Sequence, residues 1–304
     1  MVVGEEAAGA QAIRAVARSR HTLVVVLTSG GEPGGKGSTT LTAARSLGVP
    51  VWPAARVRDP SLADQVRAAG VDVLLNVHSL HVVVPDVLSA PSVGSFNLHP
   101  GPLPEYAGLN VVSWALFRGA REFGVTLHWM EPTIDSGPVA YRADFPIEDG
   151  ETAIGLMGKC VQHGMPLVDQ LLRQLTDDPG AIPAIAQDLS RREYFGRTVP
   201  GQGRISWADP ARTIVGLVRA CTYAPFASPW GEATTTLGTK VLSVLAVERT
   251  QEPCGTPSGR IGPLRDGGVW VAGGDEWVVV KRVRLDGRVV PPGEVLRSGQ
   301  LLGM

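Results

Sequence analysis

Two short stretches of the chain carry the residue types that acyl chemistry needs. In the first, Asn97 and His99 stand two positions apart in a short apolar run. An extended chain sends alternate side chains to one face, so the amide and the imidazole would leave the strand together. In the second, Asp135 precedes Gly137 in a turn, where an Asp can bond local backbone and still present an oxygen. An oxyanion donor, a proton carrier and a carboxylate that orients the carrier are sufficient for acyl transfer.

The residues after His99 place this pair at the end of a strand. Pro and Gly dominate positions 100–104, and neither residue type continues a strand interior. Open α/β sheets bind their ligands outside the carboxyl ends of the strands. The pair is therefore predicted to face a ligand cleft. Taken alone, it has a competing structural interpretation, in which His99 ends a strand and Asn97 bonds a turn.

These stretches and the motifs between them resemble the signature of folate-dependent formyltransferases. The matching segments are Asn97-Leu98-His99, Leu103-Pro104-Glu105-Tyr106, Gly108, Trp114, Gly124-Val125-Thr126 and Asp135-Ser136-Gly137. The ordered set is more specific than any single triplet, and it disfavours a purely structural role for the pair. The resemblance implies an N-formyltransferase that moves a formyl group from 10-formyltetrahydrofolate to a primary amine and releases tetrahydrofolate, without a metal.

The resemblance also implies roles for individual residues. The catalytic trio of the family falls on Asn97, His99 and Asp135. The residues implied near the folate donor are Val77, His78, Ser79, Ser136 and Gly137. On the acceptor side it implies Gly101 and Tyr106. The sequence departs from the family at Gly101, where many members have Ser, and at Ala107, where many have Arg or Lys.

The same motifs indicate which class of amine accepts the formyl group. The segments 102–110 and 113–116 are more similar to formyltransferases of natural-product pathways, including formylation domains of peptide synthetases, than to housekeeping tRNA enzymes. We therefore expect an amino acid derivative or an amino sugar, either as a free small molecule or bound to a carrier protein. Methionyl-tRNA is the alternative acceptor. The methionyl-tRNA branch carries a longer basic insertion in the region of Gly30 to Thr40, where this chain has only Lys36, and one Lys cannot make several phosphate contacts.

Two other kinds of function use the same donor. A 10-formyltetrahydrofolate hydrolase would use the same trio with water as the nucleophile, and it would release formate without any amine. A folate-binding module without enzymatic activity would bind folate tightly and turn over no acceptor. The presence of all three trio residues argues against such a module.

The pattern of apolar runs predicts the architecture of the first part of the chain. Strands are expected at 1–3, 21–27, 49–52, 71–77, 93–98, 124–130 and 138–145. Helices are expected at 10–19, 41–47, 61–69, 85–88, 110–118 and 152–175. This alternation is typical of an α/β fold with a doubly wound, mostly parallel, Rossmann-like sheet. We assign residues 1–190 to a formyltransferase catalytic domain.

Composition changes near residue 190, and a linker is expected at 188–195. A helix at 210–221 precedes five short strands at 232–237, 240–247, 259–262, 268–272 and 276–283. Such strands predict a small β-barrel, which the resemblance identifies as OB-like, within a domain of residues 191–304. This part holds 15 Lys and Arg against 10 Asp and Glu, a charge of +5, and residues 1–190 hold 13 against 19, a charge of -6. The asymmetry suggests an acidic partner, such as a carrier domain, for the C-terminal part.

The remaining composition sets the expected environment. No run of about 18 apolar residues exists, so no membrane span is expected. The first residues lack a basic region followed by an apolar core, which argues against a secretory signal. Three Cys lie far apart with no His at ligand spacing, so neither a disulfide framework nor a zinc site is expected. A cytoplasmic enzyme is predicted, and a homodimer is one possible assembly.

Overall fold

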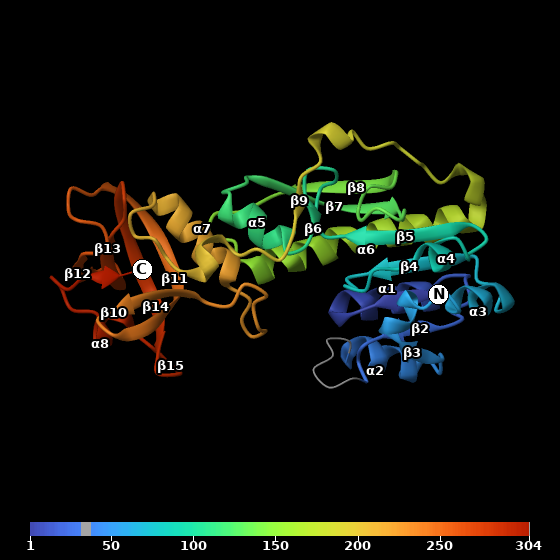
Figure 1. Cartoon of the computed structure of the whole chain (residues 1–304), viewed down its shortest axis with the longest axis horizontal. Coiled ribbons are helices and arrows are strands. Elements are labelled where there is room, and N and C mark those ends of the chain that lie inside the picture. The colour runs from blue at the N-terminus through green and yellow to red at the C-terminus, as the bar shows by residue number, and fades with distance from the viewer. Residues whose placement is uncertain (32–37, 304) are drawn as a thin grey trace. The chain divides into compact units, whose positions relative to one another are not determined.

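The computed structural model describes residues 1–31 and 38–303, and this part of the chain forms two compact units (Figure 1). Unit 1 consists of Met1–Gly108, Phe123–Phe145 and Gly158–Tyr194, and unit 2 of Leu109–Glu122, Pro146–Met157 and Phe195–Met304. Each unit therefore collects segments that are distant in the chain. The domain boundary expected between residues 190 and 191 stays a prediction.

A seven-stranded sheet forms the centre of unit 1, in the order β3-β2-β1-β4-β5-β7-β8. The strands are β1 Val2–Gly4, β2 Val26–Thr28, β3 Val51–Pro53, β4 Val73–Val77, β5 Gly94–His99, β7 Glu122–Trp129 and β8 Val139–Pro146. The first five are parallel to their neighbours, and β7 is antiparallel to β5. The predicted mostly parallel sheet is confirmed.

Helices cover both faces of this sheet. They are α1 Glu6–Arg18, α2 Ser38–Ser46, the 3₁₀ turn η1 Ala54–Arg58, α3 Leu62–Ala68, α4 Pro85–Leu88 and α6 Ala153–Asp177. Apolar residues of η1, α3 and α4 share one core with the first, second and fourth strands. On the other face, Gly9 of α1 lies so close to Gly4 that a Cβ would come within 2.8 Å of its backbone. Gly164 of α6 faces Leu98 of β5 in the same way. The sheet is therefore doubly wound.

Two element boundaries differ from the prediction for physical reasons. The strand expected at 21–27 is confined to Val26–Thr28, because its partners β1 and β3 offer only three residues each. The helix expected from Ala10 begins at Glu6, because Gly9 is a point of close helix–strand contact rather than part of a loop. In the Gly-rich loop at 30–40, residues 32–37, including Lys36, lie outside the described residues.

Unit 2 contains an antiparallel sheet with the strand order β12-β13-β14-β11-β10-β16, and β15 pairs with β14. The strands are β10 Ala233–Leu237, β11 Lys240–Pro253, β12 Ile261–Arg265, β13 Gly268–Ala272, β14 Glu276–Leu285, β15 Arg288–Val290 and β16 Leu302–Gly303. Register shifts in β11 let the sheet curl. Backbone bonds Ile261 N to Gln300 O and Leu302 N to Gly259 O, both 2.9 Å, join its two ends. The predicted C-terminal antiparallel sheet is confirmed, and its OB-like topology stays a prediction.

Smaller elements complete the two units. The helices α5 Val111–Phe117, α7 Ala211–Cys221 and α8 Pro292–Val295 belong to unit 2. The remaining 3₁₀ turns are η2 Pro179–Ala181, η3 Leu189–Arg191 and η4 Pro200–Gly203. A two-stranded sheet pairs β6 Ala107–Gly108 with β9 Tyr194–Phe195. Strands of two or three residues have too little pattern to be predicted from sequence.

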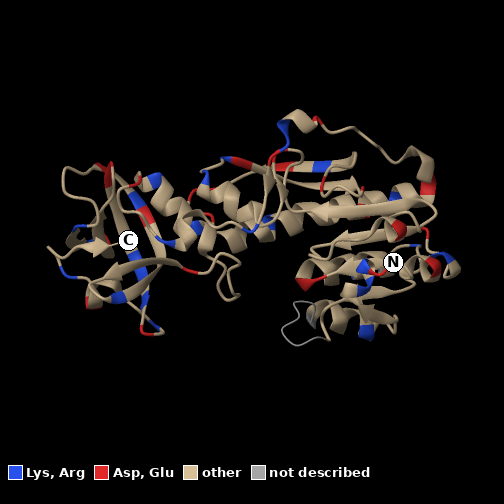
Figure 2. Cartoon of the chain, in the orientation of Figure 1, with Lys and Arg blue, Asp and Glu red and all other residues tan. Residues whose placement is uncertain are grey.

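Lys and Arg are interspersed with Asp and Glu in the C-terminal part (Figure 2), and five of its 15 Lys and Arg form ion pairs with local carboxylates. The ion pairs are Arg249–Glu276 at 2.6 Å, Arg265–Glu252 at 2.7 Å, Lys240–Asp286 at 2.9 Å, Lys281–Glu248 at 3.2 Å and Arg284–Glu232 at 3.3 Å. Paired charges attract a distant polyanion less than unpaired ones do, because their fields cancel over a few ångströms. The net charge of +5 remains, so an acidic partner for the C-terminal part stays a prediction.

Candidate active site

Three polar side chains stand in one row across the centre of the sheet of unit 1. Strand pairing sets Asn76 of β4 opposite Asn97 of β5, and Asn97 opposite His128 of β7. Asn76 and His128 are buried, whereas Asn97 between them keeps part of its surface exposed. His99, at the end of β5, is buried as well. The row therefore presents the Asn97 amide at the carboxyl end of the central parallel strands.

The turn at Asp135 lies against this row. Asp135 has a φ of 55°, a left-handed conformation that Asp and Asn adopt more readily than most residues. Its Oδ2 accepts a hydrogen bond of 2.8 Å from the Gly108 N–H. The Gln187 amide donates to the carbonyl oxygens of Asp135 at 3.1 Å and Gly137 at 2.6 Å. Side-chain and backbone bonds thus hold the carboxylate in place from two directions.

The structure brings Asn97, His99 and Asp135 together. Asn97 Nδ2 lies 3.4 Å from Asp135 Oδ1, and His99 Nδ1 lies 3.5 Å from Asp135 Oδ2. The Asp135 carboxylate thus contacts both an amide donor and an imidazole. Groups of these types in this arrangement can bind a carbonyl oxygen and move a proton.

The hydrogen bonds of His99 determine which ring nitrogen carries the proton and which can accept one. Its Nε2 lies 2.6 Å from the Tyr106 carbonyl oxygen, which can only accept, so Nε2 carries the proton. Nδ1 then faces Asp135. Burial lowers the pKa of His99 and outweighs the opposing effect of the Asp135 carboxylate. The Asp135 carboxylate itself acts to raise this pKa. Near neutral pH, Nδ1 therefore presents a lone pair.

Asp135 is held in its charged form. Burial opposes ionisation, but His99, His128 and the Gly108 N–H together outweigh it and hold the pKa of Asp135 below its ordinary value. A carboxyl group with a lowered pKa is a weak base. Asp135 is therefore better suited to stabilise a positive charge on His99 than to take a proton itself.

Sequence reasoning undervalued His128 and missed Asn76. His128 Nδ1 donates to the Trp129 carbonyl oxygen at 2.7 Å, so its Nε2 accepts from Asn97 Nδ2 at 3.1 Å. His128 Nε2 also lies 3.5 Å from Asp135 Oδ1. Asn76 was included in a buried apolar strand. The available signal was that a polar amide in a run of buried Val and Leu must have a partner.

The residues predicted to contact the folate donor lie on the two loops beside the trio. Val77 ends β4 with its carbonyl bound to the Glu5 N–H, and His78 and Ser79 follow it. Ser136 Oγ donates to the Thr133 carbonyl oxygen at 3.0 Å. Gly137 follows it in the Asp135 turn. Contact of these five residues with a donor stays a prediction.

The two residues predicted on the acceptor side support the backbone around His99. Gly101 donates its N–H to the His99 carbonyl oxygen at 2.9 Å, and its own carbonyl accepts from Thr126 Oγ1 at 2.8 Å. Tyr106 holds His99 through its carbonyl oxygen, and its ring packs edge-on against Phe123 at 5.2 Å between centroids. Both residues therefore shape the site through backbone bonds, and a contact with the acceptor stays a prediction.

Replacing His78 with Asn should make the free energy of unfolding depend less on pH below neutrality. Burial, and then the nearby His99, lower the pKa of His78 to about 4. Between that value and the ordinary value of about 6.5 the unfolded chain binds a proton that the folded chain does not, so stability falls as the pH drops. This group can account for at most about 3 kcal/mol. Asn suits the left-handed φ of 57° at this position but does not titrate.

Urea unfolding of both proteins between pH 7 and pH 4, without folate, measures this effect. The wild-type protein should lose more stability over this range than the variant does. Equal losses in the two proteins would show that His78 titrates normally in the folded state.

Replacing Gly137 with Ala should destabilise the Asp135 turn. A Cβ on Gly137 would overlap the Trp129 carbonyl oxygen, which is backbone and cannot rotate away. Overpacking of this kind costs about 1–3 kcal/mol or more. The free energy of unfolding in urea is the measurement. Gly158→Ala is the matched control: nothing lies within 4 Å of its Cβ, and Ala favours a helix, so a gain of up to about 1 kcal/mol is expected. Equal stability of the two variants would contradict the described turn.

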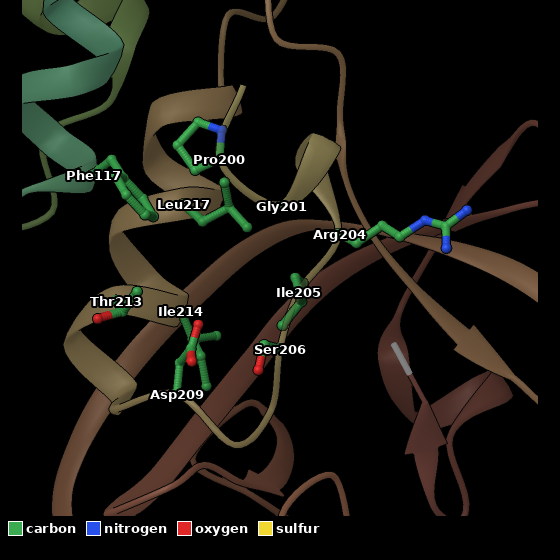
Figure 3. Close-up of a pocket in the computed structure, with 10 residues that line it drawn as sticks. All are labelled: Phe117, Pro200, Gly201, Arg204, Ile205, Ser206, Asp209, Thr213, Ile214 and Leu217. Carbon is green, nitrogen blue, oxygen red and sulfur yellow. The ribbon is translucent and has the colours of Figure 1, made fainter. Parts of the chain in front are cut away.

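A pocket of about 220 Å³ lies within unit 2 (Figure 3). Its lining consists of Phe117, Pro200, Gly201, Arg204, Ile205, Ser206, Asp209, Thr213, Ile214 and Leu217. The wall is mostly apolar, and the Arg204 guanidinium points away from it. None of the residues predicted from sequence to carry chemistry lines this pocket.

The described residues offer neither a metal-binding cluster nor a membrane-spanning helix. No group of three or more His, Cys, Asp or Glu side chains in residues 1–31 and 38–303 is placed to hold a metal ion. In the same residues no helix is both long and apolar enough to cross a membrane.

Two parts of the chain match known protein families. Residues 1–168 match formyl transferase, and residues 198–300 match the formyl transferase C-terminal domain. A methionyl-tRNA formyltransferase from Anaeromyxobacter dehalogenans (strain 2CP-1 / ATCC BAA-258) is 32% identical over 98% of this chain and 95% of the relative. One from Synechococcus sp. (strain JA-3-3Ab) is 30% identical over 85% of this chain and 80% of the relative.

Solved structures show the same fold. The N-formyltransferase from Helicobacter canadensis in complex with folinic acid and dTDP-3-aminofucose has a TM-score of 0.70 at 17% identity. The alignment covers 92% of this chain and 97% of that one. HypX from Aquifex aeolicus in complex with tetrahydrofolic acid has a TM-score of 0.62 at 17% identity, over 97% of this chain and 46% of that one.

Proposed function

Because the chain belongs to the formyl transferase family, we propose that it transfers the formyl group of 10-formyltetrahydrofolate to a primary amine. The observation that carries this proposal is the meeting of Asn97, His99 and Asp135 within 3.5 Å contacts at the carboxyl end of β5. Fold alone would not support a reaction, since related folds host many activities. The proposal rests on the residue types and their geometry.

The donor set fits a formyl carbonyl. Asn97 Nδ2 donates one hydrogen to His128 Nε2 at 3.1 Å and the other, over a longer distance of 3.4 Å, to Asp135 Oδ1, and the longer bond is the one that a carbonyl oxygen would replace. Val77 to Ser79 and Ser136 to Gly137 lie on the two loops that would hold the folate. The donor supplies an activated formyl carbon on N10. Relatives solved with folinic acid and tetrahydrofolic acid support the assignment of a folate donor.

His99 is assigned the proton transfer. Its Nδ1 takes a proton from the amine as the amine nitrogen bonds to the formyl carbon. The imidazolium that results faces Asp135 Oδ2, 3.5 Å away, and is stabilised by that carboxylate. The same proton then passes to the folate nitrogen that leaves. The net change is one C–N bond formed and one broken, with a formamide and tetrahydrofolate as products.

Asn97 is assigned the role of stabilising the negative charge that develops on the carbonyl oxygen. The carbonyl oxygen becomes an oxyanion when the amine adds, and it takes from Asp135 Oδ1 the second hydrogen of Asn97 Nδ2. A fixed donor in a partly buried site costs no reorganisation when the charge develops, which is why such donors accelerate acyl transfer. His128 and Asp135 contact this amide, and both are buried.

The acceptor we propose is an amino acid derivative or an amino sugar, either free or on a carrier protein. The segments 102–110 and 113–116 support this class of acceptor, and the single Lys36 in the loop at 30–40 argues against a long phosphate backbone, which needs several basic contacts. The second candidate is methionyl-tRNA. It is favoured by the names of relatives that are about one-third identical to this chain, at 32% over nearly its whole length.

A mass-spectrometric screen tests both candidates. The purified protein is given 10-formyltetrahydrofolate with amino sugar nucleotides, amino acids, carrier-bound amino acids and methionyl-tRNA, and products are searched for a gain of one carbonyl unit. Formylation of a small or carrier-bound amine supports the proposal, and formylation of methionyl-tRNA alone replaces the acceptor. Formate released at the same rate with no amine present would identify a hydrolase.

A further inference from the structure

Asn76 is a buried amide in a strand that otherwise holds apolar residues. It lies in β4 between Leu75 and Val77, and only 5% of it is exposed. Burying an amide without compensation costs free energy that an apolar side chain would not. A role beyond packing is therefore required to explain an Asn at this position.

Only one of the two polar atoms of the Asn76 side chain has a hydrogen-bond partner among the described residues. Its Nδ2 donates to Asn97 Oδ1 at 2.8 Å. Its Oδ1 is buried and has no hydrogen-bond partner among the described residues. A residue selected for stability alone would not leave a buried acceptor unsatisfied. The hydrogen bond that the Asn76 side chain donates therefore goes to Asn97.

The Asn97 amide forms a hydrogen bond with a neighbouring strand on each side, to Asn76 of β4 and to His128 of β7. Its Oδ1 accepts from Asn76, and its Nδ2 donates to the acceptor nitrogen of His128 at 3.1 Å. Rotating the amide by half a turn would set its NH₂ against the Asn76 NH₂. The same rotation would set its oxygen against the His128 lone pair. If the Asn76 amide turned as well, the first contact would be restored but the second would stay repulsive, so His128 fixes the orientation of Asn97 and Asn76 supports it.

We propose that Asn76 is a positioning residue for formyl transfer, which holds the Asn97 carboxamide in the orientation that aims its N–H at the reacting carbonyl. This inference rests on the proposed function for its kinetic consequence, but the orientation itself does not. A chain of amides also polarises its last donor, which strengthens the bond to an oxyanion. Asn76 touches neither substrate in this scheme and acts through Asn97.

Two substitutions separate positioning from stability. Asn76→Leu keeps the size of the side chain and removes both its donor and its unsatisfied oxygen. It should lower kcat about three- to tenfold, the value of one hydrogen bond, with KM for donor and amine unchanged and thermal stability unchanged or higher. Asn76→Asp places an acceptor against Asn97 Oδ1 and favours the inverted amide, so its kcat should be lower than that of Asn76→Leu.

A double-mutant cycle gives the decisive kinetic result. In an Asn97→Ala background, Asn76→Leu should have no further effect on kcat, because there is no amide left to orient. Ser95→Ala is the matched control, since it also removes one buried hydrogen bond from β5, 2.8 Å to the Leu88 carbonyl oxygen. Its kcat should equal that of the wild type. Independent, multiplying effects of Asn76→Leu and Asn97→Ala would overturn the proposal.

A measurement without turnover separates this inference from the proposed function. The side-chain NH₂ signals of Asn97 are assigned in a ¹⁵N NMR spectrum by their loss in Asn97→Ala. In Asn76→Leu they should shift and exchange faster with water, whereas Ser95→Ala should leave them in place. Unchanged Asn97 signals would refute the positioning role. If the wild type transfers no formyl group and releases no formate, the proposed function fails, and the NMR result still decides the role of Asn76.

Discussion

Replacing Asn97 with Ala is expected to lower kcat about 100- to 1,000-fold, the usual effect of removing one oxyanion donor. The amide binds a charge that exists only during the reaction, so KM for 10-formyltetrahydrofolate and for the amine should change much less. Ala leaves the strand backbone of β5 intact. Steady-state rates with the amine found by mass spectrometry, over a range of both substrates, measure the effect.

Two controls show whether the loss of activity comes from unfolding or from a general effect of removing a polar side chain. Thermal unfolding should show that Asn97→Ala remains folded at the assay temperature. Ser92→Ala changes a polar residue in the connection between β4 and β5, where its hydroxyl donates to Asp72 on the surface, and its rate should be that of the wild type. If Asn97→Ala retains more than about one-third of the wild-type kcat, an oxyanion role for this amide is wrong, because a useful donor contributes far more.

Replacing Asp135 with Asn is expected to lower kcat about 100- to 10,000-fold, the range over which proton transfer by a positioned group contributes. Asn is similar in shape, tolerates the left-handed φ of 55° and can still accept from the Gly108 N–H. The variant therefore removes the charge while keeping the turn. Without the carboxylate, the imidazolium that forms on His99 loses its partner.

The pH profile of the same variant tests how Asp135 acts. The carboxylate raises the pKa of His99 against the stronger effect of burial, so its loss should lower that pKa further. His99 acts in its uncharged form, and the acid limb of kcat/KM reports its pKa in the free enzyme. The limb should therefore move to lower pH while the plateau falls. Asp64→Asn, which removes an exposed carboxylate paired only with Arg67, should leave both unchanged. A limb that moves to higher pH would contradict the assigned role.

The architecture of unit 1 was predictable from its alternating apolar runs, because a parallel strand buried on both faces cannot contain many polar residues. The elements at 71–77, 85–88 and 93–98 correspond closely to β4, α4 and β5. Prediction failed where a residue type had a second meaning. The helix was expected to begin after Gly9, whereas Gly9 lies inside α1, where its lack of a side chain permits close contact with Gly4. The closing strand β16 has two residues and no pattern.

The candidate site was predictable in part. The spacing of Asn97 and His99 placed them on one face, and the family resemblance added Asp135. His128 falls in the strand expected at 124–130 and Asn76 in the one expected at 71–77, and neither position by itself predicts a contact with Asn97. Both contact Asn97 only because β4, β5 and β7 pair in one particular register. A shift of one residue would turn either side chain to the opposite face.

The amino-acid sequence by itself determined which chemical groups exist and which local conformations they favour: an amide and an imidazole on one strand, a carboxylate in a turn, and the strands that carry them. Local preferences act over a few residues, so they can decide such features. The tertiary structure alone decided that Asp135 and His128 lie beside Asn97, that burial lowers the pKa of His99, and that Asn76 orients the amide. These depend on strand register and on the exclusion of water, which arise only when segments distant in the chain pack together.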